Sequence, residues 1–170
     1  MLSLSQAIQI AFNHTTQPQL WQSLVINKRQ PYTHRAFIQQ GDTRICLHRF
    51  EPCSPDESFP HPHPWPATML ILSGVYDMAV FHTPDLKSRY PSPVLHLTLS
   101  AGSVYQMRDR HTWHQVIPRS ECYSLMINGP RWEKPHRFAP TTRGKALKPM
   151  SEAALASHLA QFRQLLVAFE

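Results

Sequence analysis

The sequence from position 61 to position 74 reads HPHPWPATMLILSG, and the interpretation of the whole chain starts from it. It opens with two histidines one residue apart, His61 and His63, and continues into an apolar stretch, 67–72, before Gly74. Side chains on a strand alternate between its faces, so two such histidines can point the same way, about 6–7 Å apart at Cα. The pair can therefore hold one metal ion from one side.

A third histidine would complete a facial set of ligands. His111 and His114 are both candidates, and the spacing alone leaves the choice between them open. A histidine that does not ligate could instead orient a ligating imidazole. The competing interpretation is a proline-rich surface loop in which His61 and His63 only make hydrogen bonds.

Length and composition predict one globular domain spanning residues 1–170. The chain is 42% hydrophobic and 16% charged, which is ordinary for a soluble protein. Its net charge is +6, from 17 basic and 11 acidic residues, and much of the excess falls within 131–148. This segment has no recognisable nucleic-acid-binding motif, so we predict a solvated basic surface and no nucleic-acid partner. An interaction module that binds an acidic partner through 131–148 is a further alternative.

The cysteines and the N-terminus bear on the compartment. Three cysteines without a CxxC spacing predict neither a disulfide framework nor a zinc ribbon. The first residues show no basic leader and no cleavage site. No apolar run approaches the ~20 residues that cross a bilayer. We therefore predict a cytoplasmic protein with no membrane partner.

Hydrophobic periodicity predicts an all-β core with helices at both ends. Residues 1–30 are expected to be a helical segment, with a helix over 3–13 capped by Ser3 or Ser5 and a short helix over 18–25. A basic, extended segment and an amphipathic helix over 151–169 are expected to fill residues 131–170. Between them, residues 35–130 form the expected barrel, with short strands at 35–39, 44–50, 67–72, 75–81, 94–99, 103–107, 113–117 and 123–128.

The first motif resembles that of the cupins, which fold as a double-stranded β-helix, or jelly roll. His61 and His63 match the HxH pair of that family, and Gly74 matches its glycine. The metal-binding glutamate of the cupin pattern falls on Ala67, so the carboxylate ligand is missing. The resemblance thus implies a three-histidine site.

The second cupin motif is only partly present. Gly102 remains, but the Pro-x-Gly segment is replaced by Arg-Asp-Arg at 108–110. The segment Trp-His-Gln-Val at 113–116 is similar to the cupin segment that carries the third ligand, which favours His114 over His111.

A narrower resemblance covers roughly residues 35–132. LHRF at 47–50, HPHPW at 61–65, LILSG at 70–74 and GPR at 129–131 are similar to a group of small bacterial single-domain cupins of largely unassigned function. Here Pro62 stands between the histidines, where that group usually has Asp.

Three neutral histidines suit a divalent transition metal, with Fe(II) favoured by the resemblance and Zn, Ni or Cu also possible. The three-histidine cupins implied by the resemblance include thiol and diketone-cleaving dioxygenases. Arg49 could hold a substrate carboxylate at two points. Tyr76, Tyr105 and Tyr123 could offer a phenol to the site. The other interpretation makes Arg49 a strand-edge charge and the tyrosines core residues, since a register error of one residue inverts every assignment.

Two functions follow from this interpretation. The first is a mononuclear Fe(II)-dependent dioxygenase that acts on a small molecule. The alternative is a non-catalytic cupin, a binding or sensor protein that keeps a vestigial or structural metal site. The expected partner is a small-molecule ligand or substrate, and a homodimer is possible because sheet edges are commonly covered.

Overall fold

The computed structural model describes residues 2–27, 30–89, 91–139 and 147–169. Within these ranges, three single-turn 3₁₀ helices lie at Pro18–Leu20, Pro55–Glu57 and Val167–Phe169. The longer elements follow in the order α1 (Leu4–His14), β1 (Gln22–Ile26), β2 (Thr33–Gln40), β3 (Thr43–Phe50), β4 (His61–Pro62), β5 (Ala67–Ser73), β6 (Val75–His82), β7 (Ser92–Ser100), β8 (Val104–Met107), β9 (Thr112–Pro118), β10 (Cys122–Asn128) and α2 (Glu152–Leu166).

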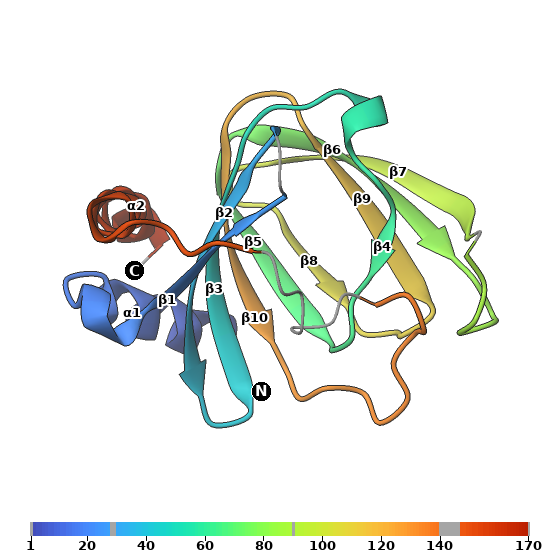
Figure 1. Ribbon diagram of the computed structural model, residues 1–170, viewed down its shortest axis with the longest axis horizontal. Coiled ribbons are helices and arrows are strands. Elements are labelled where there is room, and N and C mark those ends of the chain that lie inside the picture. Colours follow the sequence, from blue (N-terminus) through green and yellow to red (C-terminus); the bar gives the residue numbers. More distant parts are fainter. Residues whose placement is uncertain (1, 28–29, 90, 140–146, 170) are drawn as a thin grey trace.

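Two antiparallel sheets face each other and form the body of the molecule (Figure 1). The larger sheet has the strand order β1-β2-β3-β10-β5-β8, and the smaller has the order β4-β9-β6-β7. Both helices lie against the larger sheet, on the side away from the smaller one. The predicted all-β core, a cupin-type jelly roll with flanking N- and C-terminal helices, is therefore confirmed.

Strand β5 is buried on both faces, which explains its uninterrupted apolar sequence. Leu70 and Leu72 pack in a cluster with α1 and α2. Met69 and Ile71 point the other way, into clusters between the two sheets. The larger sheet thus has one face packed on helices and one face turned inward, and the inward face carries the site described below.

The predicted helix over 18–25 is wrong. Only Pro18–Leu20 forms a helical turn, and Gln22–Ile26 is strand β1, paired antiparallel with β2. The chain gains a row of backbone hydrogen bonds along the sheet, and the β-branched Val25 and Ile26 favour this extended form. The preceding helix α1 does form as predicted, and Ser3 caps it together with Gln6 in a reciprocal capping box.

The C-terminal helix α2 also forms where the apolar stripe predicts it. Ser151 caps it by accepting a hydrogen bond from the Ala154 backbone N–H at 3.2 Å. Between the C-terminal strand and this helix, the described part of 131–148 has no helix or named strand, although Lys148 makes an isolated bridge to Val25. Part of the predicted basic segment, 140–146, lies outside the described residues.

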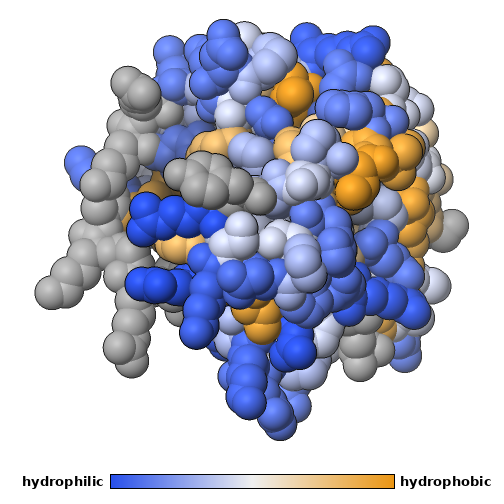
Figure 2. Space-filling view, turned by 90° about the vertical axis from the view of Figure 1, so that its right-hand side faces the viewer, coloured by the Kyte–Doolittle hydropathy of each residue, from blue (hydrophilic) through white to orange (hydrophobic). Residues whose placement is uncertain are grey.

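The molecular surface viewed from the side of the smaller sheet is mostly hydrophilic, with separate hydrophobic groups (Figure 2). The edge strand β7 exposes Val94 and Leu95. Phe59, two residues before β4, is 61% exposed. None of the helices in the described ranges combines the length and apolar character needed to cross a membrane. The possible homodimer stays a prediction.

Gly74 is expected to be essential for the turn between β5 and β6. Its φ is +86°, and an added Cβ would lie 2.5 Å from both the Cys122 Sγ and the Glu121 carbonyl oxygen. We expect Gly74→Ala to lower the free energy of unfolding by about 3 kcal/mol or more, because strain and overlap add. Gly41→Ala is the matched control: its φ is +58° but nothing lies within 4 Å, so about 1 kcal/mol is expected. Urea unfolding of both variants checks this, and equal losses would contradict it.

His158 is expected to make the protein less stable in mild acid. Its Nε2–H donates to the Leu47 carbonyl oxygen at 3.2 Å, and burial between α2 and the sheet lowers its pKa from 6.5 to about 4. The unfolded chain takes up this proton near pH 6.5 and the folded chain only near pH 4. The contribution of His158 to the free energy of unfolding is therefore fully present above pH 6.5. It falls by up to about 3 kcal/mol as the pH drops toward 4.

His158→Gln can still donate to Leu47 but does not titrate. We expect its unfolding free energy to fall less than that of the wild type between pH 7 and pH 4. Parallel pH profiles for the two proteins would show that His158 is not the group responsible.

Candidate metal centre

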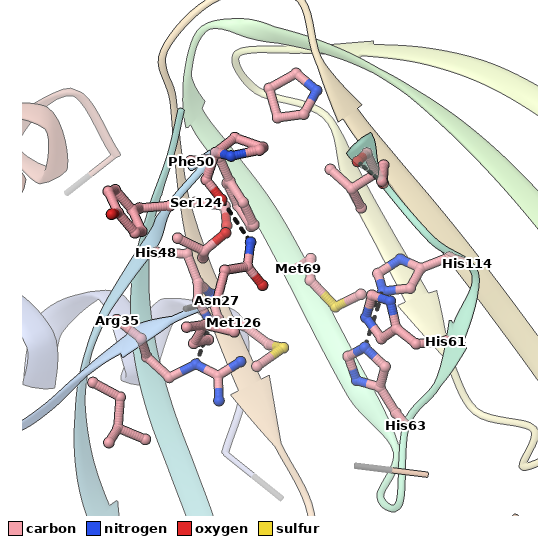
Figure 3. Close-up of a pocket in the computed structure, with 18 of the residues that line it drawn as sticks. Asn27, Arg35, His48, Phe50, His61, His63, Met69, His114, Ser124 and Met126 are labelled. Atoms are coloured by element: carbon pink, nitrogen blue, oxygen red, sulfur yellow. Dashed lines mark hydrogen bonds between the residues drawn. The ribbon is translucent and has the colours of Figure 1, made fainter. Parts of the chain in front are cut away.

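Three histidines meet at one end of the space between the sheets. β4 pairs antiparallel with β9 so that His61 lies directly opposite His114. His63 follows two residues after His61, and the rings of these two are stacked, with centroids 5.5 Å apart. Figure 3 shows the three imidazoles pointing toward one another. The structure thus brings together the three residues that the sequence nominates as ligands.

The separations between the ring nitrogens match those of metal ligands. His114 Nε2 lies 3.0 Å from His63 Nε2 and 3.1 Å from His61 Nε2, and the potential ligand atoms of all three lie within 4.8 Å of one another. Two nitrogens that each lie 2.0–2.1 Å from one ion at about a right angle are about 3 Å apart. The cluster therefore fits a divalent transition-metal ion.

Hydrogen bonds among the three imidazoles cannot satisfy all of their ring nitrogens. An unprotonated ring nitrogen offers one lone pair and a protonated one offers one hydrogen, so His114 Nε2 cannot bond well to two neighbours at once. His61 Nδ1 lies 3.3 Å from the Phe59 carbonyl oxygen and can donate to it, which leaves the lone pair on His61 Nε2 facing the cluster. A cation at the centre would accept every lone pair.

Burial keeps the three imidazoles neutral. It lowers the pKa of His61, and it lowers the pKa of His63 and His114 well below the usual range, helped by the neighbouring imidazoles. Neutral imidazole is the form that ligates a metal. At pH 7 the cluster is therefore ready to bind a metal ion without first losing protons.

No carboxylate complements the cluster from the position where the cupin pattern has one. Ala67 is buried beside Met69 and Met126, in an apolar group. Behind His114 lies a pair of phenols: Tyr76 donates to the Tyr105 hydroxyl at 2.9 Å, and that hydroxyl lies 3.5 Å from His114 Nδ1. The second contact is at the outer limit of a hydrogen bond and can help to orient the imidazole.

The cluster lines a cavity of about 510 Å³, which is the size of a small-molecule site. Aromatic and thioether side chains make much of its wall, including Phe37, Phe50, Met69 and Met126. On the wall formed by the larger sheet, Arg35 and His48 face the histidines across the cavity (Figure 3).

Two other residues that the sequence suggests for the site, Tyr76 and His111, do not belong to the histidine cluster. Tyr76 is 1% exposed and reaches the cluster only through Tyr105. His111 is not part of the cluster: its Nδ1 lies 3.1 Å from the Thr83 carbonyl oxygen, and its ring is a neighbour of His82.

Arg49 and Tyr123 lie on the other face of the larger sheet, toward α2. Arg49 Nε donates to Glu121 Oε2 at 2.6 Å, and the Tyr123 hydroxyl donates to Glu121 Oε1 at 2.5 Å. The Tyr123 ring packs edge-on against Phe162 of α2. From this face neither side chain lines the cavity of the histidine cluster.

Arg35 is the cavity residue that sequence reasoning missed. Strand alternation contains the signal: in β3, Arg49 shares a face with the apolar Ile45 and Leu47, which pack on the helices. In β2, Arg35 shares its face with Phe37, and both line the cavity. The more polar face of each strand is the one turned inward, since the helices cover the other.

Comparisons with known proteins agree on the fold. No protein-family model matches the sequence, and no curated protein matches it. Among solved structures, hydroxypropylphosphonic acid epoxidase from S. wedmorenis is similar at 13% identity and a TM-score of 0.50, over 65% of this chain and 56% of that chain. Fe(II) HppE in complex with substrate is similar at 12% identity and a TM-score of 0.50, over 65% and 57% of the two chains.

A conserved protein of unknown function from Streptococcus pyogenes is also similar, at 14% identity and a TM-score of 0.44, over 61% of this chain and 79% of that chain. The match spans little more than half the length of the HppE chains, 56% and 57% for the two structures named above. At these identities the similarity concerns the fold, which is cupin-like.

The cluster predicts metal-dependent stabilisation. Adding Co(II) or Zn(II) to metal-stripped protein at 100 times the dissociation constant is expected to raise the unfolding free energy by about 2.7 kcal/mol. The double variant His61→Ala/His63→Ala is expected to lose this gain. The matched control is His82→Ala/His111→Ala, a neighbouring pair with ring centroids 6.0 Å apart that lies outside the cluster. Thermal unfolding measures the effect, and a gain that survives in the first variant would argue against the site.

Proposed function

We propose that the protein is a metal-binding cupin that acts as a mononuclear Fe(II)-dependent dioxygenase on a small molecule. The observation that supports this most is the convergence of the His61, His63 and His114 Nε2 atoms on the wall of a partly open, mostly apolar cavity. The Fe(II) state of HppE, which shares the fold, supports the choice of iron.

The protein's own residues would supply binding and exclusion of water. The three imidazoles would hold the ion from one side, and when bound, the ion would supply redox capacity and open coordination positions. Met69, Met126 and Phe50 would hold the body of the substrate and keep water away. Tyr105 would orient His114 through its Nδ1. Arg49 and Tyr123, which bond to Glu121 on the helix-covered face, take no part in this proposal.

A non-catalytic binding or sensor cupin is the second candidate. It is favoured by Ala67, because the carboxylate ligand of the cupin pattern is replaced by a methyl group in an apolar cluster. In this case the metal would serve structure or ligand binding, and the cavity would hold a ligand without changing it.

Elemental analysis and oxygen uptake separate the two candidates. For the enzyme we expect near-stoichiometric iron after reconstitution, and substrate-dependent O₂ consumption with at least one member of a panel of thiols, diketones and phenols. His61→Ala/His63→Ala should lose both. Metal binding without O₂ consumption across the panel would favour the binding protein, and absence of metal after reconstitution would exclude the dioxygenase.

A further inference from the structure

A partly buried cation without an ion-pair partner among the described residues lies on the cavity wall opposite the histidines. Arg35 lies on β2 and lines the cavity, where partial burial lowers the pKa of its guanidinium. The charge of Arg44 lowers this pKa further, and no carboxylate among the described residues forms an ion pair with Arg35. Glu51 and Glu57 also line the cavity, but they accept hydrogen bonds from the backbone N–H groups of Tyr32 and Ser54. Burying a charge without a partner is costly, so such a residue calls for an explanation.

The hydrogen bonds of Arg35 leave its outer edge available. Its Nε donates to His48 Nε2 at 2.6 Å, and the two residues are direct partners in the β2–β3 register. His48 is itself buried and its pKa is lowered well below the usual range, so it accepts this bond as a neutral imidazole. The two terminal nitrogens of Arg35 have no acceptor among the described residues, and Figure 3 shows the guanidinium extending into the cavity.

Arg35 and the histidine cluster belong to one electrostatic environment. Across the cavity from Arg35, His61 lies on β4 of the smaller sheet and His63 lies just after that strand (Figure 3). Apolar side chains form much of the wall between them, including Phe37, Phe50 and Met126 on the larger sheet. A molecule in this cavity would therefore meet a guanidinium at one side and the three imidazoles at the other.

We propose that Arg35, held by His48, is a carboxylate-binding subsite, and that the cavity takes a small monocarboxylic acid with an apolar or aromatic body. The planar fork of a guanidinium matches the two oxygens of a carboxylate. One guanidinium neutralises one negative charge, and the apolar part of the wall suits the rest of such a molecule. A dianion such as a phosphate ester would bring a second charge into the same apolar space.

The subsite deepens the proposed function because it names the class of molecule that would reach the histidines. It rests on that function only for the metal-facing end of the ligand. Binding of the carboxylate to Arg35 needs no metal and can be measured in metal-free protein.

The test is calorimetric titration of chelator-treated full-length protein with a graded series of carboxylates, from propanoate to 2-naphthoate, each beside its neutral primary amide. We expect at least one carboxylate to bind and its amide to bind at least about 30-fold more weakly. Arg35→Met should weaken carboxylate binding at least about 30-fold, and Arg35→Lys should lie between, because it keeps the charge without the fork. Arg119→Met is the control, since Arg119 is exposed and paired with Asp77.

Thermal unfolding of the same variants separates a ligand-binding role from a structural one. If Arg35 is kept for a ligand, removing a partly buried charge that has no ion-pair partner leaves the melting temperature of the ligand-free protein unchanged or higher. A large drop for Arg35→Met, with carboxylate and amide binding alike in the wild type, would overturn the proposal. Loss of carboxylate binding in Arg49→Met but not in Arg35→Met would also overturn it and would identify Arg49 as the carboxylate-binding residue.

Metal loading of the wild type then distinguishes the two proposals. Carboxylate binding that depends on Arg35 in a protein that takes up no metal would support the subsite and reject the dioxygenase. Stoichiometric metal in a protein that shows no Arg35-dependent preference for any acid over its amide would reject the subsite and leave the dioxygenase standing.

Discussion

The pairing of β4 with β9 is the constraint on which the site depends. It is only two residues long, and it sets His61 opposite His114 while Pro62 lies opposite Trp113. β4 is an edge strand, where a proline without an N–H is tolerated. A slip of one residue would place the pyrrolidine ring against His114 and turn both histidines of the HxH pair away from it. β9 is itself held between β4 and β6, so its histidine is fixed from two sides.

The larger sheet carries the second constraint, which is the difference between its two faces. One face packs on α1 and α2 with aliphatic side chains, and the other lines the cavity with a mixture of aromatic, thioether and charged groups. Two arginines separated by this sheet have different surroundings. Arg49 is paired with Glu121 beside the helices, whereas Arg35 lies in the cavity with only His48 as a hydrogen-bond partner among the described residues.

Much of the fold could be predicted because its strands are short, periodic and separated by clear turns. The eight predicted strands all form, with ends within two residues of those observed. The helix over 18–25 failed because β1 gains its hydrogen bonds from β2, a contact that a local pattern does not contain. Alternation showed that neighbouring side chains on a strand face opposite ways, but not which face the helices cover. For that reason His61 and His63 could be paired from sequence, while Arg35 was missed.

Ala67 and Arg35 both bear on the charge of the cavity. In cupins with a glutamate ligand, that carboxylate offsets part of the charge of the metal, but here Ala67 leaves three neutral imidazoles to hold an ion. Arg35 adds a further positive charge to the same apolar cavity, and its partner His48 is neutral. A guanidinium without an ion-pair partner favours an anion beside it, because electrostatic interactions are stronger in a low dielectric, and an ion held by the histidines would add to this preference. An acid bound between Arg35 and the histidines would offset the charge of Arg35. With an ion on the histidines, its carboxylate would also offset part of the charge that the glutamate ligand offsets in other cupins.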